Sequence, residues 1–450
     1  MNIDIKPKQI DPSIRIHNYD EVVLGYTQEE AIQEASRCLN CINHPCVEGC
    51  PIHNNIPGFI KNIKENNIQE AYQIISNNSP FPSICSRVCA YEKQCQKNCV
   101  RGIQSNPVNI GALERYVCDN VDEQPIKKES NNHKIAIIGS GPSGLTCAKH
   151  LAILGYDVTV FEQEEILGGI LTYGIPEFRL PKAVVNKETN KIKNLNVKFQ
   201  TNKTLGKDIT INNLLKEYEC IYIGIGAKQA KLMNIQGEDL NGFYNANDFL
   251  YEANLNQNTF KEKIKNKKVV VIGGGNVALD VARSSIRLEA NKVDILYRRS
   301  IEESPACKDE IQQTIDENVQ FNYLVNPIEI LESENNKGHI GSIKCIKMKL
   351  DQPDENGRKK PIEIIGSDFI MDCDIVVEAI SSKVEKEALS EIMLNKYDYP
   401  ITDEFGKTSN QKVYAGGDVV DGPLSVVNAI RAGKVAAKAI DEYIKKHLES

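Results

Sequence analysis

Eight of the fourteen cysteines in this 450-residue chain form two closely spaced groups in its first part. The first group has the pattern C-x2-C-x4-C-x3-C-P, and the second has the pattern C-x3-C-x5-C-x3-C. Their members are Cys38, Cys41, Cys46 and Cys50, followed by Cys85, Cys89, Cys95 and Cys99. Thiolates at such spacings can hold two four-iron clusters, and the last cysteine of one run can serve the other cluster, as in two-cluster ferredoxins.

The same cysteines also fit two alternative roles. They could form a pair of structural zinc sites, although zinc ribbons usually use paired C-x2-C knuckles and only one such pair is present. They could also be buried free thiols. A disulfide framework is not expected, because the first residues lack the layout of a signal peptide, no apolar run approaches the ~18 residues of a membrane helix, and reducing compartments disfavour disulfides. The sequence thus predicts a cytoplasmic protein without a membrane span.

A glycine turn follows a predicted strand at residues 134–144 (KIAIIGSGPSG) and opens a predicted helix. Gly139, Gly141 and Gly144 give G-x-G-x-x-G, and the next predicted strand ends at Glu162. Such glycines allow a tight turn and the close approach of a pyrophosphate to the helix N-terminus, while the acid can accept a hydrogen bond from a ribose hydroxyl. The pattern predicts a dinucleotide site rather than an ordinary turn between strand and helix.

A second part of the same fold is predicted near the C-terminus, in VYAGGDVVDGPLSVVNAIRAGKVAAKAI. A strand there ends at Gly417 and Asp418, and a helix begins near Ser425. Asp418 can accept a hydrogen bond from a ribityl hydroxyl, and the positive helix end would stabilise the anionic reduced ring of a flavin. The first glycine turn is therefore predicted to bind FAD, and the alternative is a plain surface helix after a turn.

A second glycine turn, KKVVVIGGGNVALD, has Gly273, Gly275 and Ala278 in the form G-x-G-x-x-A. The strand that follows it ends with Arg298 and Arg299, at the place where an acid would be typical of an NAD site. Guanidinium groups can pair with the 2′-phosphate of NADP through two hydrogen bonds, whereas an acid would repel it. The sequence predicts an NADPH site, and the alternative is that the arginines are simply solvated.

We therefore predict an α-helical iron–sulfur domain followed by two α/β Rossmann-like nucleotide-binding domains, with the NADP domain inserted in the FAD domain. The predicted ranges are 1–125 for the iron–sulfur domain, 126–260 and 379–450 for the two parts of the FAD domain, and 261–378 for the NADPH domain. The formal net charge of -7 argues against nucleic acid or an anionic membrane as the main partner, because both favour a concentrated basic face.

The chain resembles the small (β) subunit of bacterial glutamate synthase and its relatives. These include the N-terminal half of dihydropyrimidine dehydrogenase and the larger subunit of NADH-dependent ferredoxin:NADP oxidoreductase. The resemblance is carried by the cysteine groups and by GSGPSG, LGGILTYGIPEFRLPK, GGGNVALD, YRR and AGGDVVDGPLSVVNAI, which occur in family order. It implies FAD, NADPH and two four-iron clusters as cofactors, and it adds Gly169 and Asn428 to the FAD contacts and Asn276 to the NADPH contacts.

The resemblance also implies cluster ligands that differ from two simple cysteine quartets. One cluster would use Cys38, Cys41, Cys46 and Cys99. The other would use Cys50, Cys89, Cys95 and Glu114, the glutamate of PVNIGALE. Cys85 would then be a structural thiol, and Cys118 has no assigned role. Two segments depart from the family, since Ser381 stands where relatives commonly carry a glycine and ESPACKDE strays from the usual M-P-A pattern, so cofactor contacts can differ there.

The predicted function is transfer of electrons from NADPH through FAD to the clusters and on to a separate acceptor. No acid or base catalyst is predicted, because the cofactors carry the chemistry. No (β/α)8 barrel for the reduction of oxoglutarate is predicted, so we expect the electron-input subunit of glutamate synthase or a similar complex. The alternative is a free-standing NADPH reductase for ferredoxin or small oxidants, which could form a homo-oligomer.

Two further functions are disfavoured. A thioredoxin-reductase-like disulfide enzyme needs a C-x-x-C pair, and the predicted NADPH domain has only the isolated cysteines Cys307, Cys345 and Cys373. A binding module without catalysis would be favoured only by a colourless purified protein.

Overall fold

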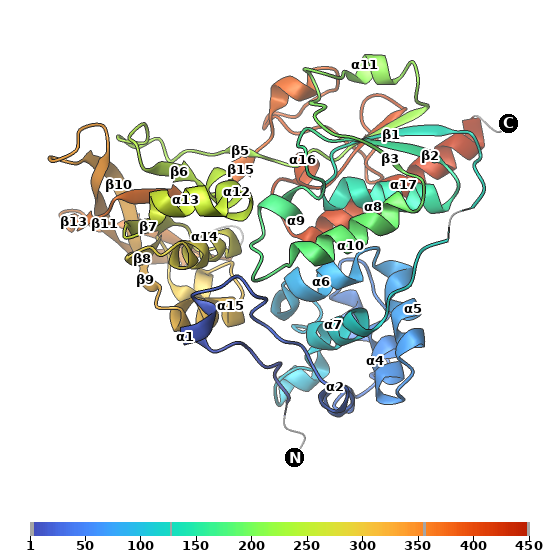
Figure 1. The fold of residues 1–450 in the computed structure, drawn as a ribbon, viewed down its shortest axis with the longest axis horizontal. Helices are drawn as coiled ribbons and strands as arrows, with labels where there is room; N and C mark the ends of the chain where they lie inside the picture. Colours follow the sequence, from blue (N-terminus) through green and yellow to red (C-terminus); the bar gives the residue numbers. More distant parts are fainter. Residues whose placement is uncertain (1–3, 127, 354–356, 448–450) are drawn as a thin grey trace.

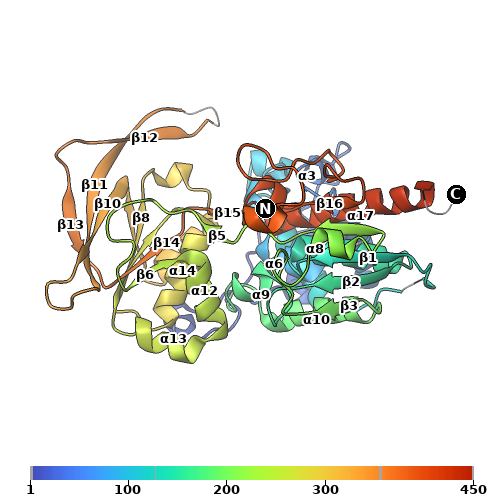
Figure 2. The ribbon, with the colours of Figure 1, turned by 90° about the horizontal axis from the view of Figure 1, so that it is seen from above.

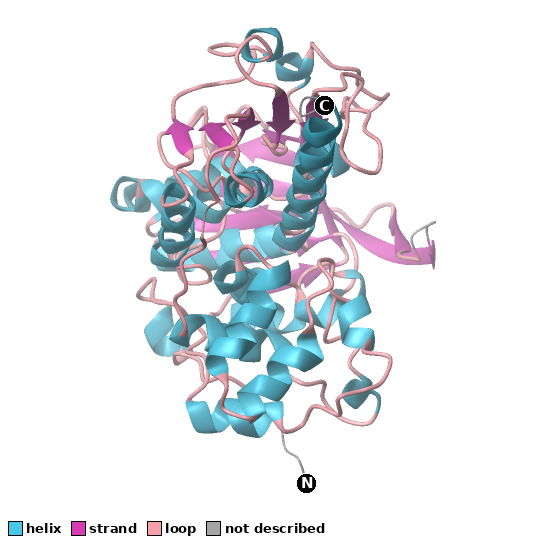
Figure 3. Cartoon of the chain, turned by 90° about the vertical axis from the view of Figure 1, so that its right-hand side faces the viewer, coloured by secondary structure: helices cyan, strands magenta, loops and turns pink. Residues whose placement is uncertain are grey.

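The computed structural model describes residues 4–126, 128–353 and 357–447. It has a helical domain and two sheet-containing domains, which Figure 1 shows in blue at the lower right, in green and red at the upper right, and in yellow and orange at the left. Figure 3 shows the helical domain below the first sheet-containing domain. This arrangement confirms the predicted fold class, because strands from two distant parts of the chain build one sheet and the segment between them builds the other.

The helical domain consists of short helices, and several of them share one core. Its elements are α1 (Pro12–Arg15), α2 (Gln28–Ala35), α3 (Pro45–Glu48), α4 (Ile56–Lys64), α5 (Ile68–Asn78), α6 (Pro82–Val88), η1 (Tyr91–Lys93), η2 (Val100–Ile103) and α7 (Ile110–Asn120). Apolar residues recur at three-to-four spacing on α4, α5 and α7, and Phe59, Ile75 and Leu113 are completely buried between them. Most of the clustered cysteines lie in the short turns and connecting segments between these helices.

The first parallel sheet has the strand order β16-β4-β1-β2-β3. Its strands are β1 (Lys134–Ile138), β2 (Asp157–Phe161), β3 (Lys198–Gln200), β4 (Cys220–Ile223) and β16 (Val413–Ala415). Its helices are α8 (Pro142–Ile153), α9 (Ile170–Tyr173), α10 (Lys182–Lys193), α11 (Ile211–Leu214), α16 (Asp418–Asp421) and α17 (Val426–His447). Since β16 pairs in parallel with β4, the C-terminal part of the chain completes this sheet.

The second parallel sheet has the strand order β6-β14-β7-β8-β9. Its strands are β6 (Phe243–Asn245), β7 (Lys268–Ile272), β8 (Lys292–Tyr297), β9 (Gln320–Tyr323) and β14 (Ile375–Glu378). Its helices are α12 (Ala246–Leu255), α13 (Gln257–Ile264), α14 (Asn276–Arg287), η3 (Ile301–Glu303) and α15 (Lys308–Asp316). An antiparallel sheet of β10 (Val325–Glu332), β11 (Ile340–Pro353), β12 (Lys359–Glu363) and β13 (Phe369–Asp372) extends this domain, and Figure 2 shows β11 and β12 projecting away from the rest of the protein.

The two sheet-containing domains are joined by two chain crossings that lie side by side. The outgoing crossing contains β5 (Gln229–Ala230), the returning crossing contains β15 (Ser382–Lys383) before η4 (Lys386–Leu389), and the two strands pair antiparallel. The predicted boundary between residues 260 and 261 falls inside α13, whose Phe260 and Ile264 pack in the core of the second sheet. We therefore propose to draw this boundary before Phe243, where β6 begins.

The first segment of the helical domain reaches across to the second sheet domain. In α1, Arg15 donates from Nε to Glu317 at 2.7 Å, and Glu317 also accepts from Arg283 at 2.8 Å and from Arg287 at 2.6 Å. All four side chains are buried, and the guanidinium of Arg287 lies 3.9 Å from the centre of the Phe178 ring. Although burial by itself raises the pKa of Glu317, the surrounding arginines lower it to about 2. These contacts hold the helical domain's first segment, the FAD-domain segment around Phe178 and the second sheet domain together.

No helix in the described ranges is long and apolar enough to cross a membrane.

Candidate cofactor sites

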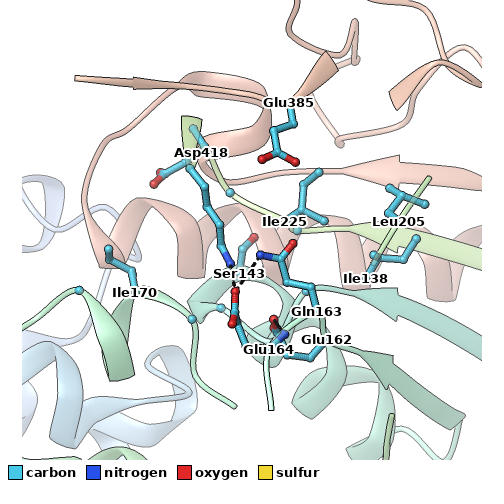
Figure 4. A pocket seen from close by; sticks show the side chains of 18 of the residues that line it. Ile138, Ser143, Glu162, Gln163, Glu164, Ile170, Leu205, Ile225, Glu385 and Asp418 are labelled. Atoms are coloured by element: carbon cyan, nitrogen blue, oxygen red, sulfur yellow. Dashed lines mark hydrogen bonds and ion pairs between the residues drawn. The ribbon is translucent and has the colours of Figure 1, made fainter. Parts of the chain in front are cut away.

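A large cavity lies at the carboxyl ends of β1, β2 and β16 and around the first glycine turn. Figure 4 shows Asp418 and Glu385 facing Glu162, Gln163 and Glu164 across it. Five of the eight residues predicted to contact FAD line this cavity, namely Gly139, Gly141, Glu162, Gly169 and Asp418. The remaining predicted residues, Gly144, Gly417 and Asn428, do not line it. The carboxyl end of a parallel sheet is where nucleotides bind in such folds.

The glycine turn leaves room for a ligand at one glycine and packs tightly at another. A Cβ built on Gly141 would have no heavy atom within 4 Å, whereas a Cβ built on Gly144 would meet the carbonyl oxygen of Gly139 at 2.0 Å. Gly141 precedes α8 as its N-cap and has no side chain to cap the helix. The free N–H groups of this helix end therefore face space that an anion can fill, and the cavity fits the pyrophosphate of FAD.

Glu162 organises the turn around this cavity. Its Oε2 accepts hydrogen bonds from the backbone N–H of Ser140 at 2.8 Å and from the Ser140 hydroxyl at 2.6 Å, and its Oε1 accepts from the N–H of Glu164 at 3.0 Å. The Ser140 hydroxyl in turn accepts from the N–H of Gly168 at 3.1 Å. Glu162 thus stabilises the turn through these hydrogen bonds. The sequence predicted only that it would accept a hydrogen bond from a ribose hydroxyl.

The C-terminal segment supplies the opposite wall. Asp418 begins α16, and its Oδ1 accepts from the N–H of Leu424 at 3.3 Å. Burial raises the pKa of Asp418 to about 6, the bond from Leu424 lowers it, and the neighbouring Asp421 raises it. Asn428 instead donates from Nδ2 to the hydroxyl of Ser425 at 2.9 Å, so its side chain supports the start of α17.

Residues of the inserted domain also reach the cavity, and no sequence motif predicted them. Asn247 and Tyr251 of α12 line it, and the Tyr251 ring lies 5.7 Å from the ring of Tyr173 on α9. Lys228, next to the crossing strand β5, pairs with Glu164 at 3.3 Å. The cavity is therefore lined by residues of both sheet domains, which is the arrangement needed to bring two nucleotides together.

The structure gathers the eight predicted cluster ligands into two groups that differ from the order of the chain. A cavity in the helical domain is lined by Cys38, Cys41, Cys46 and Cys99, together with aliphatic side chains such as Ile60. We call these four cysteines the outer cysteine group. Cys99, the last cysteine of the second run, thus lies with the first run. All four thiols are partly exposed.

The inner ligand group consists of Cys50, Cys89, Cys95 and Glu114. Burial raises the pKa of Cys95 well above its usual value, and the next two causes are the charges of Cys50 and Glu114. A hydrogen bond with Cys85 is the largest cause of the raised pKa of Cys89, followed by burial. Cys85 therefore lies beside this group as a fifth thiol, although the family resemblance gives it no ligand role.

Glu114 is buried beside these thiols and is not a solvated helix residue. It is 6% exposed on α7, and burial raises its pKa to about 8, while a bond from the Tyr91 hydroxyl at 3.5 Å lowers it. A buried carboxylate is costly unless a cation or hydrogen bonds compensate it. Within the described ranges no three His, Cys, Asp or Glu side chains converge as the ligands of a single metal ion would. Three thiols and one carboxyl that lie near one another suit a four-iron cluster, in which each ligand would bind a different iron.

The two groups lie at different depths relative to the flavin domain. Cys85 is part of the hydrophobic core of the first sheet domain, and Cys50 and Cys89 pack against that core. In contrast, Cys38 and Cys99 pack only in the core of the helical domain. Cys50 and Cys89 of the inner ligand group therefore lie at the boundary with the flavin domain, Cys95 lies in the core of the helical domain, and the outer cysteine group lies farther from the flavin domain.

The second glycine turn is held by the segment that departs from the family. Gly275 precedes α14 as its N-cap, and a Cβ built on it would contact only Pro305, at 3.5 Å. Asn276 accepts from the N–H of Cys307 at 3.1 Å through Oδ1, and the Ser304 hydroxyl donates to the carbonyl of Gly274 at 2.7 Å. Of the other predicted residues of this turn, Gly273 follows β7 directly and Ala278 is completely buried in α14.

Three arginines gather after β8. Arg298 is exposed, whereas Arg299 is buried and donates from Nε to the carbonyl of Lys359 at 2.9 Å. Burial and then the charges of Arg299 and Arg358 lower the pKa of Arg298. Arg358 lies just before β12, about sixty residues away in the sequence, and no local motif marked it. The positive charge at this strand end is therefore larger than the sequence predicted.

The comparisons with known proteins concern the two parts of the chain that contain these groups. Residues 15–126 match the family described as dihydropyrimidine dehydrogenase domain II, 4Fe–4S cluster, and residues 133–433 match the pyridine nucleotide-disulphide oxidoreductase family. The small chain of NADPH glutamate synthase from Escherichia coli is 32% identical, over 97% of this chain and 98% of the relative. The chain belongs to the glutamate synthase small-chain family. It is thus an oxidoreductase of the kind that carries FAD, a pyridine nucleotide and 4Fe–4S clusters.

The chain is also similar to another curated relative and to a solved structure. The β subunit of the NADP-dependent formate dehydrogenase of Moorella thermoacetica is 35% identical over 90% of this chain, which spans 60% of that subunit. The solved structure of FprA from Mycobacterium tuberculosis in complex with NADPH has a TM-score of 0.59 and 20% identity, and it covers 71% of this chain and 86% of its own. The last likeness concerns the fold of the two sheet domains alone.

The remaining thiols give no support to disulfide chemistry. Cys307, Cys345 and Cys373 are all buried, and burial is the largest cause of their raised pKa values. A thiol that exchanges with a substrate disulfide must be accessible and partly ionised.

Proposed function

We propose that this chain oxidises NADPH and passes the electrons through FAD and two four-iron clusters to a separate acceptor, as the electron-input subunit of glutamate synthase or of a similar complex. The observation that carries the proposal is the series of sites. The flavin cavity, the inner ligand group at the boundary of the flavin domain, and the partly exposed outer cysteine group follow one another. Such a series would connect a flavin bound in this cavity to the protein surface.

The proposed flavin site uses the glycine turn and the two acids that face it. When bound, FAD accepts hydride from NADPH, and the clusters carry single electrons onward. The N-terminus of α8 would hold the pyrophosphate at Gly141, because its free N–H groups point into open space. Glu162 would position the adenosine ribose from a turn that three hydrogen bonds already hold rigid, and Asp418 would accept from the ribityl chain.

The proposed NADPH site uses the second glycine turn and the arginines after β8. Arg298 is exposed and makes no hydrogen bond or ion pair with the residues that the structure describes. It would bind the 2′-phosphate, while the charges of Arg299 and Arg358 would add to the positive field there. Asn276 would act indirectly, because its side chain is already bonded to Cys307 and holds the wall of the site.

The proposed cluster ligands follow the two groups. The outer cysteine group, Cys38, Cys41, Cys46 and Cys99, would hold one cluster. The inner ligand group, Cys50, Cys89, Cys95 and Glu114, would hold the other. Cys95 and Glu114 are buried, and their burial supports a ligand role, because a buried thiolate or carboxylate is costly unless a cation compensates its charge. Cys85 would stay a neighbour that hydrogen-bonds Cys89.

An electron-accepting partner is part of the proposal. Relatives of this chain bear the names of a small chain of glutamate synthase and a β subunit of formate dehydrogenase, which supports a subunit role. The test is anaerobic purification of the protein from its own cells. We expect a brown protein with FAD, about eight irons per chain, bleaching by NADPH and a copurifying acceptor subunit. Stoichiometric zinc with little iron would overturn the cluster assignment. A homogeneous protein with full NADPH-to-ferredoxin turnover would favour the free-standing reductase.

A further inference from the structure

One lysine of the flavin domain contacts the helical domain close to the inner ligand group. Lys434 lies on α17, and its Nζ donates to the backbone carbonyl of Asn78 at 3.2 Å and to the side-chain oxygen of Asn78 at 3.0 Å. Asn78 in turn donates from Nδ2 to the carbonyl of His53 at 3.0 Å. The N–H of His53 donates to the carbonyl of Cys50 at 2.9 Å. A continuous set of hydrogen bonds thus leads from Lys434 to a residue of the inner ligand group.

The charge of Lys434 is half-buried and forms no ion pair with a carboxylate of the described residues. Burial lowers the pKa of Lys434, and the charge of Cys50 raises it. Lys149, a second cation of this interface, differs, because burial lowers its pKa to about 8 and the carboxylate of Glu188 raises it. His150 adds no charge here, since burial and then the two lysines lower its pKa to about 4. Lys434 is therefore the cation of this interface whose opposite charge is a cysteine of the inner ligand group.

The helix that carries Lys434 also contacts the flavin cavity. Ala429, near the start of α17, lines that cavity, and Lys434 follows it by about 8 Å along the helix axis. Val427 and Ile430 of the same helix belong to the hydrophobic core against which Cys50 packs. The helix thus contacts both of the sites between which electrons would pass.

We propose that Lys434 raises the reduction potential of the cluster held by the inner ligand group, so that this cluster accepts electrons from the flavin. We call it the inner cluster, and the one held by the outer cysteine group the outer cluster. The inference rests on the proposed function, because it takes Cys50 and Glu114 as ligands. Lys434 would act through its charge and would take no part in the electron transfer itself.

The physical reason is the charge that reduction adds. Each electron leaves the flavin that NADPH has reduced and adds one negative charge to the inner cluster, so no further reductant is needed. Thiolate and carboxylate ligands are already anionic and disfavour that added charge. A fixed cation nearby stabilises the reduced form more than the oxidised form, and net charge is one of the factors that set such potentials.

The size of the effect follows from the distance over which the charge acts. For unit charges roughly 10 Å apart at an effective dielectric constant of about 20, loss of the cation changes the one-electron equilibrium constant about tenfold, which is about 59 mV. The alternative is that Lys434 only ties the two domains together through its bonds to Asn78. A purely structural lysine would leave the potential unchanged.

The test is a redox titration of the anaerobically purified protein, followed by electron paramagnetic resonance, together with the iron and FAD contents. Lys434→Met removes the charge and the hydrogen bonds, Lys434→Gln removes the charge but keeps a donor, and Lys434→Arg keeps both. The matched control is Lys438→Met, because Lys438 lies on the same helix, its side chain is 80% exposed and it pairs with Glu442 at 3.8 Å. The signal of the inner cluster is the one that Glu114→Ala alters.

We expect both neutral variants to lower the midpoint potential of the inner cluster by the equivalent of about tenfold in the equilibrium constant. The potential of the outer cluster, the iron content and the FAD content should stay as in the wild type. Excess NADPH should then reduce a smaller fraction of the inner cluster. Lys434→Arg and Lys438→Met should both keep the wild-type potential.

Four results would overturn the role of Lys434 while leaving the proposed function standing. These are an unchanged inner-cluster potential in both neutral variants, an equal shift of both clusters, a shift in Lys434→Arg as large as in Lys434→Met, and loss of iron from both neutral variants, which would mean that Lys434 holds the domains together. If Glu114→Ala altered neither signal, the ligand assignment on which the inference rests would be wrong. A wild-type protein without iron, or without NADPH oxidation, would refute the proposed function itself.

Discussion

Replacing Arg298 with alanine separates recognition of the 2′-phosphate from the stability of the inserted domain. Arg298 is exposed and forms no hydrogen bond or ion pair with described residues, so its loss leaves no buried group without a partner. Arg299 differs, because it is buried and its Nε holds the carbonyl of Lys359. Substitution of Arg298 therefore tests binding of the 2′-phosphate, whereas substitution of Arg299 also tests the stability of the domain.

The expected size of the effect follows from the kind of bond. A hydrogen bond to a charged group contributes ~1.5–3 kcal/mol, which corresponds to a roughly ten- to hundredfold change in affinity. Since Arg298 is exposed to solvent, we expect the lower end, a roughly tenfold rise of the NADPH KM. Arg358→Ala should give a smaller, few-fold rise, because it contributes mainly through the local field. Arg299→Ala should raise the KM and also lower the unfolding temperature.

The assay is steady-state reduction of a small neutral quinone with NADPH and with NADH, together with the FAD and iron contents of each variant. Arg298→Ala should leave the weaker NADH reaction almost unchanged, because NADH has no 2′-phosphate. Lys261→Ala is a control cation, since Lys261 pairs with Glu289 on the surface of the same domain at 2.6 Å. That control should alter neither nucleotide's KM.

Three results would refute this reasoning. Equal losses with NADPH and NADH in Arg298→Ala would mean that the arginine supports the domain rather than the phosphate. An unchanged NADPH KM would place the 2′-phosphate elsewhere, and a wild-type preference for NADH would remove the NADP assignment altogether.

Three further predictions concern the other sites. Glu114→Ala should alter or remove one cluster, as seen by iron analysis and electron paramagnetic resonance, while Cys85→Ala should leave both clusters in place; the reverse result would support two simple cysteine quartets. Gly141→Val should lower the FAD content of a folded protein, because its side chain would enter the cavity, whereas Gly144→Val should lower the unfolding temperature, because a Cβ there would meet a carbonyl oxygen at 2.0 Å. Arg15→Ala should cost about 1–3 kcal/mol of stability in denaturant unfolding without changing iron content, and an unchanged midpoint would contradict its role as an anchor.

The sequence predicted what local patterns encode. The glycine turns, the strands before them and the helices after them depend on residues within about a dozen positions, because turn geometry and helix ends are set by neighbours in the chain. The order of these motifs also predicted that one nucleotide domain interrupts the other, and the pairing of β16 with β4 confirms it. The cysteine spacing alone predicted clusters but did not distribute the ligands, and Glu114 came from the family resemblance.

What only the tertiary structure decided are contacts between residues that are far apart in the chain. Arg358 joins the arginines after β8, and Arg15 pairs with Glu317 across about three hundred residues. The position of Cys99 with the outer cysteine group is also such a contact, and before the structure only the family resemblance implied it. No periodicity or spacing records such pairs, because they arise when separately folded elements pack against each other. The position of each cysteine group relative to the flavin domain was also decided only by the tertiary structure. It depends on which core each thiol joins, and that is fixed only when the helical domain docks on the flavin domain.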